Sequence, residues 1–175
     1  VGLGGVGLSA LLASLAVGSK KTIAIDLSDE KLALASELGA DHTLNPKDEN
    51  FLEKMRDLTS GGANIAIETA GSGRALETAY DITRRGGTTV AAGMPGPEVN
   101  ITLSHLSIAA EERVLKGSYM GSCVAQRDIP KYLDMFQTGK LPVDRLLSRK
   151  IKFEDLNEAM DRLDGAKTVR EVLIP

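Results

Sequence analysis

Short apolar runs alternate with amphipathic stretches along the first two-thirds of the chain. Leucines recur at the spacing of one helix face over residues 8–15, and Gly18 follows as a C-terminal stop. Residues 22–25 form a short, β-branched apolar run, which is typical of a strand buried on both faces. The pattern therefore predicts a helix followed by a buried strand.

The alternation continues to residue 118. Ser28 is placed to cap the next helix, and Gly39 to end it. The remaining pattern predicts helices over 50–58 and 74–84, and strands over 41–44, 65–67, 88–92 and 114–118. Strands separated by helical stretches of about 10–15 residues favour parallel crossovers. Residues 1–120 are therefore predicted to form an α/β fold, a doubly wound parallel sheet of the Rossmann type.

The pattern changes from Gly121. We expect a helix capped by Asp128 that ends at Thr138, a second helix over 154–163 and a final strand over 168–173. About 50 residues are too few for a core of their own. We predict that residues 121–175 complete a second, catalytic domain.

The chain begins abruptly at Val1. A Rossmann unit needs a buried strand before its glycine turn, and only the last residue of such a strand stands there. The features of a signal peptide are also absent from this end. We expect the chain to be part of a longer polypeptide, with its first strand largely missing.

Composition narrows the classes of function. Of the 175 residues, 42% are hydrophobic and 26% charged, as in ordinary globular domains. A net charge of −3, three Phe, three Tyr and no Trp disfavour nucleic-acid binding. The longest apolar run, residues 8–17, is too short to span a bilayer. One cysteine excludes an internal disulfide and fits a reducing compartment, so we expect a cytoplasmic protein.

A glycine-rich turn opens the chain. It comprises Gly2, Leu3, Gly4, Gly5, Val6 and Gly7, with the spacing G-x-G-x-x-G. The first glycine of this motif permits a tight turn, the second lets backbone approach a pyrophosphate, and the third lets helix and strand pack closely. Glycine-rich turns also serve purely structural ends, and 18 glycines can give this spacing by chance. The helix that follows favours the cofactor interpretation.

Asp26 ends the next strand, 19 residues after Gly7, where a ribose-binding acid belongs. A carboxylate there accepts both ribose hydroxyls of NAD and repels the extra phosphate of NADP, so it favours NAD. The alternative is that Asp26 caps the following helix. Lys31 either reaches the same ribose or is a solvated helix charge, and spacing alone does not decide between these.

Small residues follow two later strands, as Thr69-Ala70-Gly71 and Ala92-Gly93-Met94. They leave room for adenosine and nicotinamide respectively, although ordinary turn chemistry explains them equally well. The isolated residues His42, His105 and Cys123 lack partners at metal-ligand or nucleophile spacing. We therefore predict no metal site and no catalytic residue in this chain.

The sequence resembles the coenzyme domain of zinc-containing medium-chain alcohol dehydrogenases, in order and over its whole length. The resemblance lies in the stretches GLGGVGLSALL, AIDLSDEKLALASELGADHTLNP, IAIETAGS, AAGMP, KGSYMGS and VREVLIP. It implies an oxidoreductase that transfers hydride between NAD and an alcohol, or a thiol adduct of formaldehyde.

The resemblance also assigns roles. It implies that Asp26 and Lys31 bind the adenosine ribose, and that Thr69 and Ala70 line the adenosine side. It also implies that Gly93 and Met94 lie beside the nicotinamide, and that backbone groups of Ser118 and Met120 bind the nicotinamide carboxamide. Arg170 would bind the pyrophosphate. The family's zinc ligands and proton-relay residues would precede Val1. Its dimers join through the sheet edge near 101–103 and 113–118, and Val99, Ile101 and Leu103 have the two-residue period of a strand.

Two other functions stay open. A zinc-free quinone reductase of the same superfamily typically prefers NADPH, which Asp26 disfavours. A non-catalytic NAD-sensing domain should have a complete first strand and no unattached tail. A methyltransferase of similar fold would lack the tail that ends near Arg170.

Overall fold

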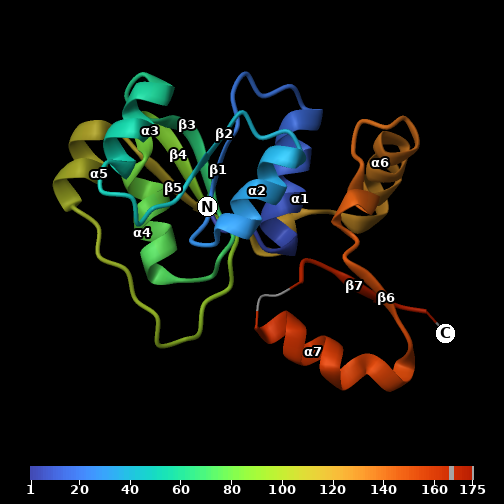
Figure 1. Ribbon diagram of the computed structural model, residues 1–175. Coiled ribbons are helices and arrows are strands. Elements are labelled where there is room, and N and C mark those ends of the chain that lie inside the picture. The colour runs from blue at the N-terminus through green and yellow to red at the C-terminus, as the bar shows by residue number, and fades with distance from the viewer. Residues whose placement is uncertain (166–167, 175) are drawn as a thin grey trace.

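The computed structural model describes residues 1–165 and 168–174, and residues 166, 167 and 175 lie outside this description (Figure 1). Its elements are α1 (Gly5–Ala16), β1 (Ile23–Ile25), α2 (Asp29–Glu37), β2 (His42–Leu44), α3 (Phe51–Thr59), β3 (Ala63–Glu68), α4 (Gly73–Asp81), β4 (Thr83–Ala91), α5 (His105–Glu111), β5 (Val114–Gly117), η1 (Tyr119–Ser122), α6 (Ala125–Gln137), η2 (Val143–Leu146), β6 (Arg149–Ile151), η3 (Phe153–Asp155), α7 (Leu156–Asp164) and β7 (Glu171–Leu173).

The strands are parallel and have the order of a doubly wound sheet. One group is β2–β1 and the other is β3–β4–β5. Val1 and Gly2 lie between them: Gly2 N donates to Ile25 O at 2.8 Å, and Thr69 N donates to Val1 O at 2.9 Å. Because chain order runs outward in both directions from Val1, the glycine turn stands at the topological switch point, where such sheets bind ligands. The predicted fold class is confirmed.

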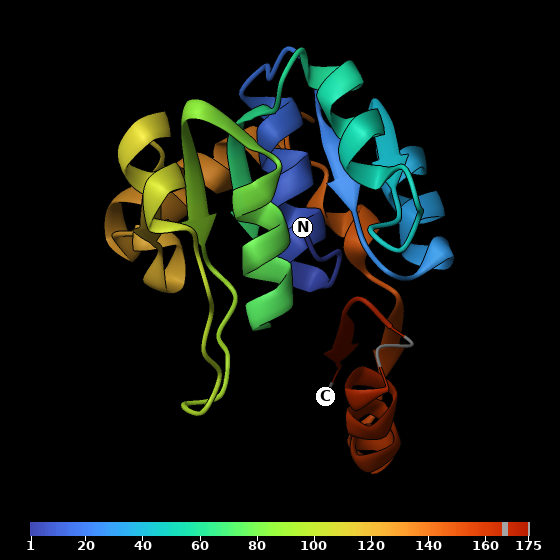
Figure 2. The ribbon, with the colours of Figure 1, turned by 90° about the vertical axis from the view of Figure 1, so that its left-hand side faces the viewer.

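Helices cover both faces of the sheet, and each face has its own core (Figure 2). On one face, α1 and α2 bury leucines that include Leu8, Leu11 and Leu32. On the other, Phe51 and Met55 of α3 pack with Ile82, which follows α4. The helical spacing of the leucines over residues 8–15 had predicted the buried face of α1. Burying each such side chain contributes about 1.5–3 kcal/mol, so the two cores hold the turn firmly in place.

The helix predicted over 74–84 is shorter than expected. α4 ends at Asp81, and β4 already begins at Thr83. The Thr83 hydroxyl lies 2.7 Å from Ala79 O and 2.8 Å from the Thr89 hydroxyl, in a fully buried position. This local hydrogen bonding ends the helix early, and Arg84 lies in the strand.

Residues 99–104 are all described and form a loop, so the two-residue period there does not produce a strand. The helix α5, which periodicity did not predict, follows directly. Its N-terminus is capped by the Ser104 hydroxyl, which accepts from Ser107 N at 3.3 Å.

The C-terminal segment also differs in detail from the prediction. α6 begins at Ala125, so Asp128 is not its N-cap, although the Asp128 carboxylate accepts from Val124 N at 2.9 Å and so satisfies the helix start from within the first turn. β6 was not predicted, and it pairs in parallel with β7. In Figure 1 the unit formed by β6, β7 and α7 projects from the sheet. Across the described residues, no helix is long and apolar enough to cross a membrane.

Candidate dinucleotide-binding site

The glycine turn is closely packed at its first and third glycines. Gly2 has φ +89°, and a Cβ there would lie 2.8 Å from the Cβ of Ala70. A Cβ on Gly7 would overlap the Gly2 carbonyl and come within 2.8 Å of Thr69 Oγ1. Both positions therefore require glycine: Gly2 for its backbone conformation and the close approach of Ala70, and Gly7 for the close approach of α1 to the turn.

Gly4, in contrast, faces open space. No atom of the described residues lies within 4 Å of where its Cβ would stand. Gly4 is also the N-cap of α1, and no described side chain caps this helix. The free N–H groups of the first turn and the positive end of the helix dipole favour an anion at this point. The backbone here fits a pyrophosphate, which needs both an open approach and unpaired donors.

Asp26 follows β1 and lies beside the turn. Its Oδ2 accepts from Leu3 N at 2.6 Å, and its Oδ1 accepts from Ser28 N at 2.9 Å. The cap of α2 is Ser28, whose hydroxyl accepts from Lys31 N at 3.4 Å, as the sequence predicted. Asp26 is therefore not needed as the cap. It is half-buried, and it links the glycine turn to the start of α2. Lys31 is in the first turn of α2.

The end of β3 is tied to the same turn. Thr69 Oγ1 donates a hydrogen bond to Gly2 O at 2.8 Å and lies 3.0 Å from Val1 O. Ala70 packs so closely against Gly2 that a Cβ on Gly2 would lie 2.8 Å from Ala70 N. These two residues therefore have a structural role beside the turn, as well as the adenosine-lining role that the resemblance implies.

Gly93, Met94, Ser118 and Met120 lie at the carboxyl ends of β4 and β5. Gly93 packs against Gly71, and Met94 is 71% exposed. Ser118 N donates to Ala91 O at 2.9 Å, which continues the sheet pairing past β5. Met120 has φ 50° and is also largely exposed. The positions predicted from the sequence thus gather along the carboxyl edge of the sheet.

Arg170 comes to the glycine turn from the far end of the chain. A Cβ on Gly5 would stand 3.3 Å from Arg170 Nη2 and 3.1 Å from Val169 O. The guanidinium is therefore next to the open N-terminus of α1. A planar group with several donors suits bidentate contact with phosphate oxygens. The pyrophosphate-binding role of Arg170 that the resemblance implies stays a prediction.

Glu68 is a residue of this region that sequence reasoning missed. Its side chain is buried at the end of β3, and its Oε1 accepts from Gly71 N at 2.6 Å. The available signal was an acid in the last position of a buried strand, directly before Thr69.

Other chemical groups are scattered. His42 lies in β2, His105 begins α5, and Cys123 is exposed. Among the described residues, no group of three or more His, Cys, Asp or Glu is placed to hold a metal ion. A cavity of about 610 Å³ lies between β1 and β3 beside Val1, and its lining includes Lys20, Lys21 and Gly62. These residues belong to the amino ends of the strands, whereas the glycine turn is at the carboxyl ends.

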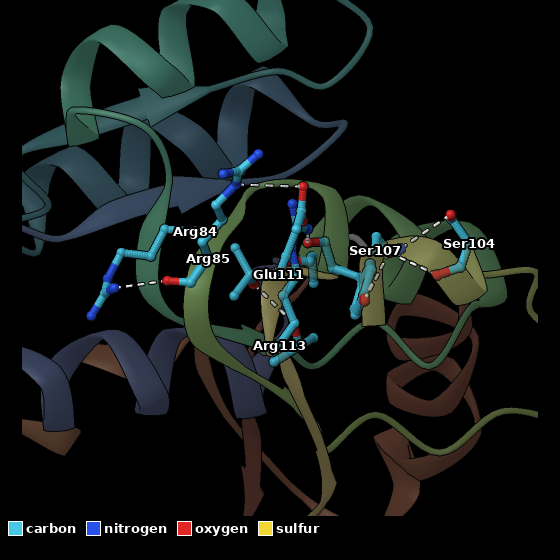
Figure 3. Close-up of polar contacts among 10 residues, drawn as sticks. Arg84, Arg85, Ser104, Ser107, Glu111 and Arg113 are labelled. Atoms are coloured by element: carbon cyan, nitrogen blue, oxygen red, sulfur yellow. Dashed lines mark hydrogen bonds and ion pairs between the residues drawn. The ribbon is translucent and has the colours of Figure 1, made fainter. Parts of the chain in front are cut away.

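The free edge of the sheet is built around an ion-pair cluster (Figure 3). Arg113 Nε lies 2.6 Å from Glu111, and Arg85 Nε lies 3.9 Å from the same carboxylate. Arg113 also donates to the Tyr80 carbonyl, and its guanidinium stacks over the Tyr80 ring at 4.9 Å. This cluster joins α4, β4 and α5 through Arg113, which directly precedes β5. All four residues of β5 are exposed.

Comparisons with known proteins identify the family. Residues 5–138 match the family described as "Zinc-binding dehydrogenase". The chain is 35% identical to geraniol dehydrogenase of Castellaniella defragrans and 33% identical to alcohol dehydrogenase class-2 isozyme 2 of Oryctolagus cuniculus. Each match covers 99% of this chain and 46% of the relative. The chain thus spans about half the length of these curated relatives.

A solved structure supports the same family assignment. The benzyl alcohol dehydrogenase of Acinetobacter calcoaceticus matches with a TM-score of 0.93 and 30% identity, over 98% of this chain and 47% of that one. The family model covers well over half of the chain, and the matching structure shares both the sheet and the C-terminal segment. The chain belongs to the zinc-binding dehydrogenase family, as the resemblance implied.

Proposed function

We propose that this chain is the coenzyme-binding part of an NAD-dependent alcohol dehydrogenase. The observation that carries the proposal is the meeting of the open helix start at Gly4, the Asp26 carboxylate and the Arg170 guanidinium around one turn. These three groups complement a pyrophosphate and the ribose next to it. The relatives' names, which specify geraniol and benzyl alcohol, support an alcohol as substrate.

The residues of the chain act by binding and orienting. When NAD is bound, its nicotinamide ring supplies the hydride acceptor. The N–H groups at the start of α1 and the guanidinium of Arg170 hold the phosphates, and Asp26 holds the adenosine ribose with Lys31 beside it. The ends of β4 and β5, with Gly93, Met94, Ser118 and Met120, receive the nicotinamide half. No group of this chain is given a proton-transfer role.

Asp26 decides the choice of coenzyme in this proposal. Its two oxygens already accept from Leu3 N and Ser28 N, which fixes the carboxylate at the end of β1. A fixed negative charge next to the ribose repels the 2′-phosphate of NADP. This argument favours NAD over the NADPH preference of a zinc-free quinone reductase. The relatives named above are all dehydrogenases, which supports catalysis over a purely NAD-sensing role.

We further propose that the full-length protein binds its catalytic zinc through residues outside this chain, and that it forms a homodimer through β5. All four residues of β5 are exposed. Because an open strand edge needs to be covered by another part of the protein or by a partner, this exposure supports the dimer. The one cysteine fits a reducing compartment, and we place the protein in the cytoplasm.

A fluorescence titration of the 175-residue chain with NADH and NADPH tests the proposal. We expect NADH to bind at least about tenfold more tightly, a difference of about 1.4 kcal/mol. Asp26→Asn keeps an acceptor for Leu3 N and removes the negative charge. It should therefore reduce the difference in affinity between NADH and NADPH. Tighter binding of NADPH by the wild-type chain, or binding of neither nucleotide, would contradict the proposal.

A further inference from the structure

Glu68 is a buried carboxylate at the centre of the carboxyl edge of the sheet. It is the last residue of β3, and only 2% of it is exposed. Burying an ionisable side chain is costly unless the chain supplies donors for it. Its burial here therefore points to a specific contact.

The bonds of Glu68 join two loops that leave different strands. Its carboxylate Oε1 accepts from Gly71 N at 2.6 Å, in the loop after β3. Its backbone carbonyl accepts from Ala92 N at 2.9 Å and from Gly93 N at 3.0 Å, in the loop after β4. One residue thus fixes both loops at once.

The two loops cross with no room between them. Gly71 has φ +69°, and a Cβ on it would lie 2.7 Å from Met94 O. A Cβ on Gly93 would lie 2.7 Å from Gly71 Cα and 2.8 Å from Glu68 Oε1. Backbone packs on backbone, so the position of Gly71 determines the position of the Gly93–Met94 segment.

We propose that Glu68 is a positioning residue, whose carboxylate sets the Gly93–Met94 backbone through Gly71 and thereby orients the nicotinamide half of the coenzyme. The inference rests on the proposed function, which places that half at the ends of β4 and β5. A hydrogen bond to a charged acceptor is stronger and shorter than a neutral one, which suits it to holding a loop in one place. Thr69, in the same loop, is tied to the glycine turn by its own bonds to Val1 O and Gly2 O, so the binding of the adenosine and pyrophosphate half depends on Glu68 less than the binding of the nicotinamide half does.

The test compares NADH with ADP-ribose, which has the same adenosine, pyrophosphate and second ribose but no nicotinamide. In Glu68→Met the new side chain is close to glutamate in length but has no oxygen to accept from Gly71 N. In Glu68→Gln the side chain keeps an acceptor oxygen. Glu154→Met alters an exposed glutamate in η3 and serves as the control. Dissociation constants for both ligands are measured on the 175-residue chain by calorimetry, with far-UV circular dichroism for each variant.

We expect Glu68→Met to raise the Kd of NADH about tenfold and to change the Kd of ADP-ribose less than about twofold. For Glu68→Gln and Glu154→Met, both dissociation constants should stay near the wild-type values. An equal loss for both ligands, or a loss of folded structure shared by Glu68→Gln, would show a merely structural role and overturn the inference. Equal affinity of the wild-type chain for the two ligands would also overturn it, because no nicotinamide contact would then exist to be oriented. Binding of neither ligand by the wild-type chain would instead refute the proposed function, and the inference with it.

Discussion

The sheet and the C-terminal segment differ in how many of their apolar side chains they bury. Residues 1–120 bury two cores, one on each face of the sheet. In residues 121–174, large apolar side chains stay exposed along α6, α7 and the strands beside it: Ile129, Tyr132, Leu133, Phe136, Phe153, Met160, Leu163 and Val172. The buried hydrophobic residues described in this segment are Leu141, Leu146, Ile151 and Ala159, and the first two of these pack against the core beside α1.

The difference shows that stability and binding draw on different parts of the chain. The sheet holds itself together and fixes the glycine turn. The C-terminal segment has little core of its own, yet it delivers Arg170 to that turn. Substitutions of buried side chains in the sheet should therefore affect folding most, whereas Arg170→Ala in the segment should affect binding with little effect on folding.

The largest effect is expected from Gly7→Ala. The added methyl would overlap the Gly2 carbonyl, so α1 must move away from the turn. We expect a loss of about 3 kcal/mol in the free energy of unfolding, measured by urea denaturation. The matched variant Gly4→Ala places its methyl in open space, and it should lower stability by only about 1 kcal/mol, the cost of a poorer N-cap. It should still weaken NADH binding, because the methyl stands where the pyrophosphate approaches. Equal stability losses in the two variants would contradict this account of the turn.

Arg170→Ala tests the contribution of the C-terminal segment to binding. We expect the Kd of NADH to rise about tenfold or more, since a hydrogen bond to a charged group contributes about 1.5–3 kcal/mol. The midpoint of urea denaturation should stay near the wild-type value. Lys150→Ala removes an exposed charge from β6 in the same unit and should leave the Kd unchanged. A similar rise in the Kd of NADH in both variants would show a general effect of positive charge rather than a contact of Arg170 at the glycine turn.

The ion pair between Arg162 and Glu171 should make the segment sensitive to acid. Arg162 Nε and Nη2 donate to the Glu171 carboxylate at 2.8 and 2.7 Å, and these bonds lower the pKa of Glu171 below its ordinary value of 4.5. The stabilisation by this carboxylate is therefore present above pH 4.5 and is lost as the pH falls through the lowered pKa. Glu171→Gln should unfold at a lower temperature than wild type at pH 7, and the two should converge as the pH falls through the lowered pKa of Glu171. A difference that persists at low pH would show that charge is not the cause.

The smallest effect is expected from Phe153→Asp. This side chain is 71% exposed, so replacing it should change the free energy of unfolding by less than about 0.5 kcal/mol. Phe51→Asp is the matched change in the sheet, where the ring is 6% exposed, and it should unfold the chain. If urea denaturation showed a large loss in the free energy of unfolding for Phe153→Asp, the segment would have a core of its own.

Local signals predicted most of the sheet and the first half of the site. Ser28 was predicted as the cap of α2, and its hydroxyl does accept from Lys31 N. The three motif glycines were assigned separate roles, and the crowding at Gly2 and Gly7 and the open space at Gly4 match them. The motif residues themselves lie close together in the chain, which is why spacing reveals them, although part of the crowding at Gly2 and Gly7 comes from Ala70 and Thr69.

Most features that the sequence did not reveal depend on distant contacts. The early end of α4 is an exception, because the buried bonds of Thr83 to Ala79 and Thr89 are local. The approach of Arg170 to Gly5 joins residues 165 positions apart, and only the family resemblance indicated it. Glu68 gave no periodic signal at all, because its role lies in a crossing of two loops. β6, with two charged residues of three, does not have the apolar pattern of a strand.

The central claim is that the coenzyme binds at the glycine turn with Arg170 beside it. Backbone amide chemical shifts of the 175-residue chain, recorded by NMR during titration with NAD, test this most directly. We expect the largest shifts at Gly4, Gly5 and Val6, with further shifts near Asp26 and Arg170, and little change at the control position Lys150. Shifts that cluster around the cavity beside Lys20 and Gly62, and leave the start of α1 unchanged, would contradict the claim.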